Sequence, residues 1–123
     1  MKLPLATRND LLHYFDRADI IRQTAEQLTR DMEQFGETIV YSGNPATAYE
    51  ELFKQTEPFI QKLIFQRYEK LLQLLYRIDV NEKFIAEVVS SGKDVSAGIT
   101  HLILYRELQK VVIRNYYSAN KSG

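Results

Sequence analysis

FIQKLIFQRYEKLLQLLYRID, residues 59–79, is the stretch that decides the fold of this chain. On a helical wheel its apolar side chains centre on Tyr68 and cover roughly twice the ~100° stripe that a surface helix needs. A helix with so wide an apolar surface must be covered from more than one side. We therefore expect this stretch to be the central helix of an all-α domain, in which a charge at Leu71 or Leu72 would unfold the protein.

Composition limits the remaining possibilities. The 123 residues fit one helical domain, 1–123, that can bury a core without metals or disulfides, and we expect residues 1–8 and 118–123 to be frayed. The lack of cysteine excludes thiolate nucleophiles and cysteine-ligated metals. The start is too short for a signal-peptide core, and no apolar run is long enough to span a membrane. These features predict a cytoplasmic protein with no membrane contact.

Charge is balanced overall but not along the chain. Residues 1–57 carry six Lys or Arg and ten Asp or Glu, whereas residues 58–123 carry ten and six. The simpler interpretation is that helices from the two halves pack against each other, and the alternative is a head-to-tail or swapped dimer. Zero net charge argues against a nucleic-acid-binding protein.

The first helix should begin at Asn9 or Asp10 and end at Gly36, since both ends carry capping residues. A heptad seam runs along it and includes Tyr14, Ala18, Ile21, Ala25, Leu28, Met32 and Phe35. Residues 36–44 then form a loop. Its apolar residues Ile39, Val40 and Tyr41 have no partner strand, so we expect them to cover one end of a bundle; the alternative is an edge that binds an extended peptide.

The Asn44–Pro45 pair predicts the start of a second long helix, which should kink near Pro58 or, failing that, break there. Asp79 and Glu82 have the spacing of a capping box and predict a short helix from Val80 to Ser90. It should bury Phe84, Ile85, Val88 and Val89. The last helix should run from Asp94 or Ser96 to about Tyr117. The expected fold is an antiparallel bundle of about four helices: long, long with the kink, short, and long.

Two sets of residues are candidates for an interface with a second copy or with another protein. The small residues of the heptad seam would let a partner helix approach closely, and that helix belongs more simply to the same chain than to another copy. Two tyrosines near the chain's end could anchor a partner, although one of them more simply completes the core. The candidates are Ala18, Ile21, Ala25, Met32, Tyr116 and Tyr117.

His101 is the candidate for a ligand site. It falls on the apolar face of the last helix, close to Ala97 and Gly98, where the helix surface is thin. A buried histidine needs hydrogen-bond partners and is most simply a satisfied core residue. The functional alternative is an internal pocket for a small molecule, lined by His101, Tyr105, Tyr68 and Tyr76.

Catalytic and metal-binding arrangements are hard to build from this sequence. The other histidine is His13, no Glu-x-x-His spacing occurs, and the five glycines are scattered. Acidic residues fall mostly on polar faces. We expect no cofactor, no metal and no catalytic residues.

The sequence favours a non-enzymatic interaction or assembly module that self-associates. One alternative is a small-molecule-binding or enzymatic bundle with its pocket at His101. The other is a nucleic-acid-binding regulator that uses the stripe Arg106, Lys110 and Arg114, which is more simply a solvated basic face.

Overall fold

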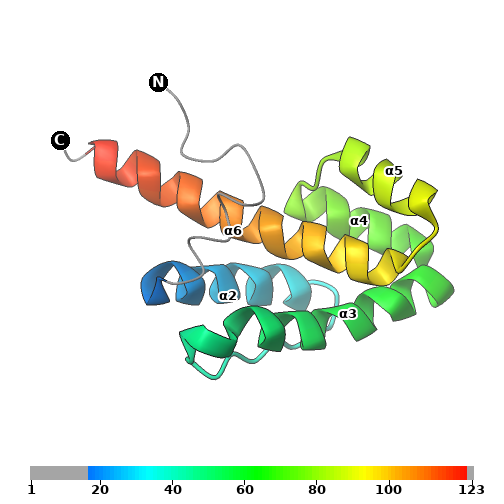
Figure 1. Ribbon diagram of the computed structural model, residues 1–123, viewed down its shortest axis with the longest axis horizontal. Coiled ribbons are helices and arrows are strands. Elements are labelled where there is room, and N and C mark those ends of the chain that lie inside the picture. The colour runs from blue at the N-terminus through cyan, green and yellow to red at the C-terminus, as the bar shows by residue number, and fades with distance from the viewer. Residues whose placement is uncertain (1–16, 122–123) are drawn as a thin grey trace.

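The computed structural model describes residues 17–121, and their side chains as far as Ser118. This part of the chain is all-helical and contains no strand (Figure 1). Five α-helices and one 3₁₀ turn follow in order: α2 (Ala18–Glu33), η2 (Pro45–Thr47), α3 (Ala48–Gln66), α4 (Tyr68–Ile78), α5 (Glu82–Ser91) and α6 (Val95–Lys121). The expected helix start at Asn9 or Asp10, the expected frayed end 1–8 and the seam residue Tyr14 lie outside the described residues.

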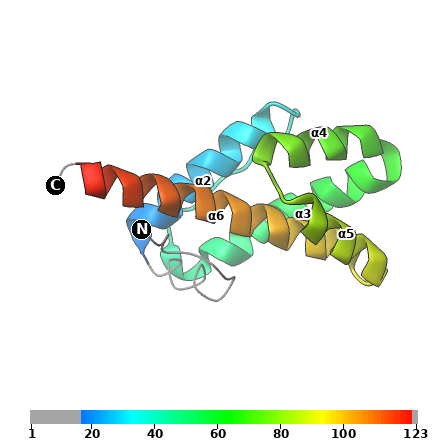
Figure 2. The same ribbon diagram turned by 90° about the horizontal axis from the view of Figure 1, so that it is seen from above.

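The last helix, α6, is the centre of the fold. It runs along the length of the molecule and packs against α2, α3, α4 and α5 (Figures 1 and 2). It also continues to Lys121, beyond the expected end at Tyr117. Its fully buried apolar residues recur at helical spacing: Ile99, Ile103, Leu104, Leu108 and Val111. The prediction that residues 59–79 form the central helix is therefore wrong.

Residues 59–79 form parts of two helices because the chain breaks at Arg67. This residue has φ −145° and ψ 65°, which ends α3 and starts α4 in a new direction. In Figure 2, α4 turns back over α3. Tyr68, the expected centre of the buried surface, is 48% exposed, and so is Leu72. The buried face of α4 is instead Leu71, Leu74, Leu75 and Ile78.

The break accounts for the wide apolar surface of this stretch. One straight helix would have to be covered on about two thirds of its circumference, whereas two shorter helices can each turn a narrower stripe to the core. Pro58, where we expected a kink or a break, lies inside α3 and does not end it. Pro58 is exposed, as is Lys54 one turn earlier, so water can reach the carbonyl that the proline leaves without a donor.

The loop between α2 and α3 is ordered and closes one end of the core. Gly36 adopts φ +80°, a conformation that residues with a Cβ rarely take, and so turns the chain after α2. Ile39 is buried in the main core, whereas Val40 is exposed. Gln55 of α3 holds the Val40 backbone by accepting from its N–H at 2.8 Å and donating to its carbonyl at 2.7 Å.

The start of α3 follows the expected signal, but the start of α5 does not. The Asn44 side chain accepts a hydrogen bond from the Ala46 N–H, and Pro45 begins the 3₁₀ turn that leads into α3. Asp79 does not cap α5. It takes a left-handed conformation, φ +69°, that ends α4, and Asn81 is the capping residue, accepting from the Lys83 N–H at 2.8 Å.

Helix α5 lies on the outside of the molecule and has no fully buried residue. Its expected burial was therefore wrong: Phe84 and Val89 are 48% and 45% exposed, and Ile85 and Val88 are half-buried. The helix packs against α6 where Gly98 leaves room for Val88, because a Cβ on Gly98 would lie 2.7 Å from Val88 Cγ1. Glycine thus sets how closely α5 approaches α6.

Candidate functional site

A broad groove of about 1250 Å³ lies between α4, α5 and α6. We call it the α4–α5–α6 groove. Helix α5 packs against α6 and makes few contacts with α4. Its apolar lining includes Leu72, Tyr76, Phe84, Ile85, Val88 and Leu102, and its polar lining includes Asp79, Glu82, Arg106 and Gln109.

Large apolar side chains stand exposed along the groove and beside it. Tyr76 is 87% exposed, Phe65 is 80% exposed, and Tyr68, Leu72 and Phe84 are each 48% exposed. Exposed single apolar residues are ordinary on protein surfaces, but these five come from the end of α3 and from the adjoining helices α4 and α5. Aromatic residues in such a position are typical of surfaces that bind another molecule.

An aromatic cluster borders the groove on its α6 side. The Tyr49 hydroxyl of α3 and His101 Nδ1 of α6 share a hydrogen bond. The His101 ring lies 4.6 Å from that of Phe53 and 6.0 Å from that of Tyr105, measured between ring centroids. These contacts fix the orientation of the imidazole, and His101 is also one of the residues that line the groove.

The structure brings together three of the four residues of the expected ligand pocket. His101, Tyr105 and Tyr76 all line the groove, whereas Tyr68 does not. The tyrosine that bonds to His101 is Tyr49, which the sequence did not single out. These three residues line a groove that opens at the surface, whereas the functional alternative of the sequence analysis was an internal pocket.

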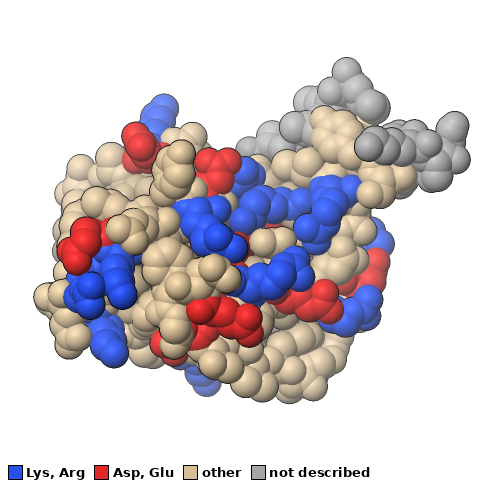
Figure 3. All heavy atoms as spheres, turned by 180° about the vertical axis from the view of Figure 1, so that it is seen from behind, with Lys and Arg blue, Asp and Glu red and all other residues tan. Residues whose placement is uncertain are grey.

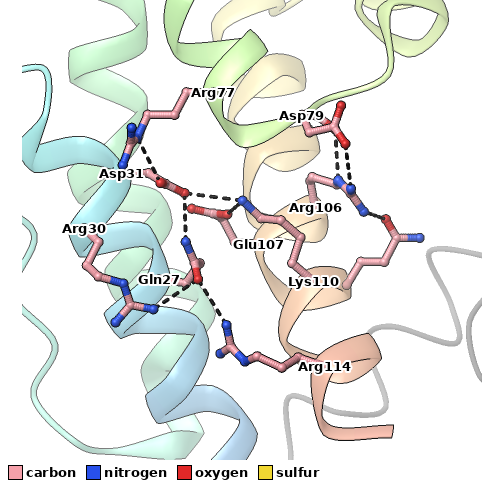
Figure 4. Close-up of polar contacts among 10 residues, drawn as sticks. Gln27, Arg30, Asp31, Arg77, Asp79, Arg106, Glu107, Lys110 and Arg114 are labelled. Carbon is pink, nitrogen blue, oxygen red and sulfur yellow. Dashed lines mark hydrogen bonds and ion pairs between the residues drawn. The ribbon is translucent and has the colours of Figure 1, made fainter. Parts of the chain in front are cut away.

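A second polar site joins α2, α4 and α6 (Figure 4). Asp31 of α2 is buried and pairs with Arg77 Nε at 3.1 Å and with Lys110 Nζ at 3.3 Å. Gln27 donates to the same carboxylate at 3.3 Å. Glu107 of α6 is fully buried beside it, with the Lys110 ammonium 2.5 Å from Oε1. We call Asp31, Glu107, Lys110 and Arg77 the buried charge network.

Burial decides the charge of Glu107. Neither of its oxygens receives a hydrogen bond from the described residues, and the approach of Lys110 is an ion-pair contact. Burial, with a hydrogen bond to Asp31, raises the pKa of Glu107 to about 8, although Lys110 opposes this. Burial also acts to raise the pKa of Asp31, but the hydrogen bond from Glu107 and the charge of Lys110 outweigh it and keep that pKa below its usual range. Of the two carboxyl groups, Glu107 therefore takes up a proton at higher pH than Asp31 does.

The expected basic stripe is tied into the protein's own contacts. Arg106 pairs with Asp79 at 2.9 Å, Lys110 belongs to the buried charge network, and Arg114 donates to Gln27 at 3.3 Å. Figure 3 shows Lys and Arg side chains gathered in a band on the face turned away from the viewer in Figure 1, with acidic side chains beside them. The carboxylates of Asp79 and Asp31 partly neutralise the charges of Arg106 and Lys110, whereas Arg114 bonds to the uncharged Gln27.

Most of the expected interface seam is used inside the chain. Ile21, Ala25 and Met32 are buried, and Ala18 is exposed. At the other candidate position, the rings of Tyr116 and Tyr117 lie 5.6 Å apart and nearly perpendicular, with Tyr116 half-buried and Tyr117 exposed. The seam thus supplies core packing, and the larger exposed apolar surface lies at the α4–α5–α6 groove.

Asp31 and Glu107 were not predicted as site residues, because we expected acidic residues on polar faces. A usable signal was present for Glu107: Ile103 and Val111, one turn before and one turn after it, are both apolar. An acidic residue between apolar residues at four-residue spacing is directed toward the core. Asp31 carries a weaker signal, since Leu28, three residues before it, and Phe35, four residues after it, are apolar.

Three or more metal-ligating side chains do not come together anywhere in residues 17–121. No helix in this part of the chain is long and apolar enough to cross a membrane. Comparison with protein-family models, with curated proteins and with solved structures finds no match to this chain. The candidate site therefore has to be interpreted from its own geometry.

Proposed function

We propose that this protein is a non-enzymatic interaction module whose binding face is the α4–α5–α6 groove. The observation that carries the proposal is the exposure of Leu72, Tyr76 and Phe84 in one groove, with Phe65 and Tyr68 exposed on the adjoining helices outside it. Burying such side chains is the main driving force of protein association, and aromatic residues dominate the energy of known interfaces. The chain has no cysteine, which fits the reducing conditions of the cytoplasm, where we place the protein.

The shape of the groove favours a protein partner over a small molecule. A small-molecule site encloses most of its ligand, whereas here the aromatic side chains project from the rim and would remain exposed beside a small ligand. The groove has helices on three sides and can accept an amphipathic helix laid along α4. Polar residues at its edge, such as Glu82 and Gln109, then form the rim.

The proposal is tested by affinity purification from the cells in which the protein occurs. The double variant Tyr76→Ser, Phe84→Ser removes two rim aromatics, and Val40→Ser removes an exposed apolar residue of the α2–α3 loop as a matched control. Losing a central aromatic contact typically costs ~2 kcal/mol, or roughly 30-fold in affinity. Specific partners should be depleted with the double variant and retained with the control. Equal recovery with both variants would contradict the proposal.

A small ligand beside His101 is the second candidate, favoured by the imidazole that Tyr49 holds at the edge of the groove. His101→Phe keeps a ring of similar size but removes the hydrogen bond. If a bound small molecule is present in native mass spectra of the wild type, the variant should lose it and keep the helical circular dichroism. A spectrum of the wild type without added mass would remove this candidate.

A further inference from the structure

We propose that the partner bound at this face is a second copy of this chain, packed α4 against α4 in antiparallel orientation about a two-fold axis at Leu72. The inference rests on the proposed function, namely that the α4–α5–α6 groove binds protein. It adds the identity of the partner and the register of the contact. Two properties support it: the symmetry of the exposed stripe of α4, and the apolar area that α4 exposes together with the end of α3 and with α5.

The exposed stripe of α4 is symmetric about Leu72. Tyr68 and Tyr76 each lie four residues from Leu72 and about 40° to either side of it, so all three side chains share one face of the helix. In an antiparallel pair centred on Leu72, Tyr68 packs against the partner's Tyr76, and Leu72 packs against the partner's Leu72. A two-fold interface needs such a self-complementary surface, because every contact is made twice.

The exposed apolar area is of the size that a stable dimer needs. Phe65 is 80% exposed, Tyr76 is 87% exposed, and Tyr68, Leu72 and Phe84 are 48% exposed. Because a large side chain of this kind presents about 200 Å², the five together expose on the order of 600 Å². In a standard interface each partner buries about 800 Å² of accessible surface, and the outer part of that surface is polar. Such a patch lies at the upper end of what a free monomer exposes.

The charges around α4 do not oppose the antiparallel orientation. Its start carries Arg67 and Lys70 with Glu69, a small excess of positive charge, whereas the region of its end carries Arg77, Asp79, Glu82 and Lys83, whose charges balance. Antiparallel packing therefore sets no strongly charged end beside one of the same sign. The formal net charge of the chain is zero, so two copies do not repel each other through their overall charge.

Cross-linking tests the register directly, because the natural chain has no cysteine and each variant carries one thiol. Under mild oxidation L72C should form a disulfide-linked dimer with itself. Y68C and Y76C should each link poorly alone, because identical positions lie about 12 Å apart along the axis, but should link efficiently when mixed. V40C, on an exposed loop away from α4, is the control for random collision.

The mass of the protein in solution completes the test. We expect the wild type and Val40→Glu to show twice the chain mass of 14.4 kDa and Leu72→Glu to show the monomer mass with unchanged helical circular dichroism. If Leu72→Glu unfolds, the cross-linking result decides alone. A wild type that stays monomeric at its highest concentration, with L72C linking no faster than V40C, would overturn the dimer.

The dimer can fail without the proposed function. In that case the double variant Tyr76→Ser, Phe84→Ser still loses partners in affinity purification, and the groove binds a different protein. Both proposals fail if no dimer forms and if the variant Tyr76→Ser, Phe84→Ser recovers the same proteins as Val40→Ser. In that case the groove is not a protein-binding site.

Discussion

At the scale of single residues, the buried charge network makes folding depend on pH. Glu107 keeps its proton in the folded protein up to a pKa of about 8, whereas an unfolded glutamate loses it near 4.5. Between these values the folded state binds one proton more than the unfolded state, so the free energy of unfolding falls as pH rises. Asp31, whose pKa is lowered, acts in the opposite sense, and stability is also lost as pH falls below the usual range of aspartate.

Glu107→Gln should remove the loss of stability at rising pH. The amide has the shape of the protonated carboxyl group and can still donate to Asp31, but it does not ionise. The wild type should lose up to about 4 kcal/mol of stability between pH 5 and pH 8.5, whereas the variant should stay nearly constant and exceed the wild type at pH 8.5. Urea denaturation at several pH values measures this difference.

Glu26→Gln is the control for that experiment, because Glu26 is an exposed acidic residue with a partner, Arg22, on the same helix. Its pH profile should follow that of the wild type. A Glu107→Gln profile parallel to the wild-type profile would mean that Glu107 is ionised in the folded protein, and the assignment of a raised pKa to Glu107 would be wrong.

Leu71 and Leu72 are neighbours in sequence but differ in burial, and a pair of substitutions should separate them. Leu71 is 1% exposed and faces the core, whereas Leu72 is half exposed at the groove. Leu71→Ala should lower the free energy of unfolding by about 2–5 kcal/mol, and Leu72→Ala by about 1 kcal/mol. Chemical denaturation at low protein concentration, where association contributes little, gives both values. Equal losses would contradict the placement of α4.

At the scale of elements, the sequence predicts those helix ends that depend on local chemistry. Gly36 ends the turn after α2, and Asn44 with Pro45 starts the segment of α3, as expected. The break at Arg67 has no such signal, because no glycine, proline or capping residue marks it. It depends on how much apolar surface the rest of the chain can cover, and that is a property of tertiary packing.

Helix α5 is the least supported element of the described chain, and Gly98 controls its position. Alanine usually stabilises a helix by about 1 kcal/mol relative to glycine. Gly98→Ala should instead leave stability unchanged or lower it, because its methyl group would meet Val88, whose branched side chain has little freedom in a helix. Thermal denaturation monitored by circular dichroism measures this.

Val88→Ala provides the matching test for that contact. In the double variant the methyl group of Gly98→Ala has room, so the substitution should now show its ordinary helix-stabilising effect. A double-mutant cycle over the four proteins gives the interaction energy between the two positions. A value of zero would mean that α5 does not lie against Gly98.

At the scale of the whole molecule, the all-helical class was predictable and the arrangement was not. Periodicity identified the apolar faces, but the choice of α6 over residues 59–79 as the central helix depends on which faces meet. The same holds for the site: His101 was identified from its own helix, while Tyr49, its partner, lies 52 positions earlier in the chain. Contacts across such distances leave no trace in local spacing.

The central claim is that the α4–α5–α6 groove binds a protein, and site-specific photo-cross-linking in living cells tests it most directly. A photoreactive phenylalanine derivative in place of Tyr76 reports whatever protein lies on the groove, and the same group in place of Val40 is the control. We expect a covalent adduct from position 76 and none from position 40, with a mass of twice 14.4 kDa if the partner is a second copy. No adduct from position 76, or equal adducts from both positions, would contradict the claim.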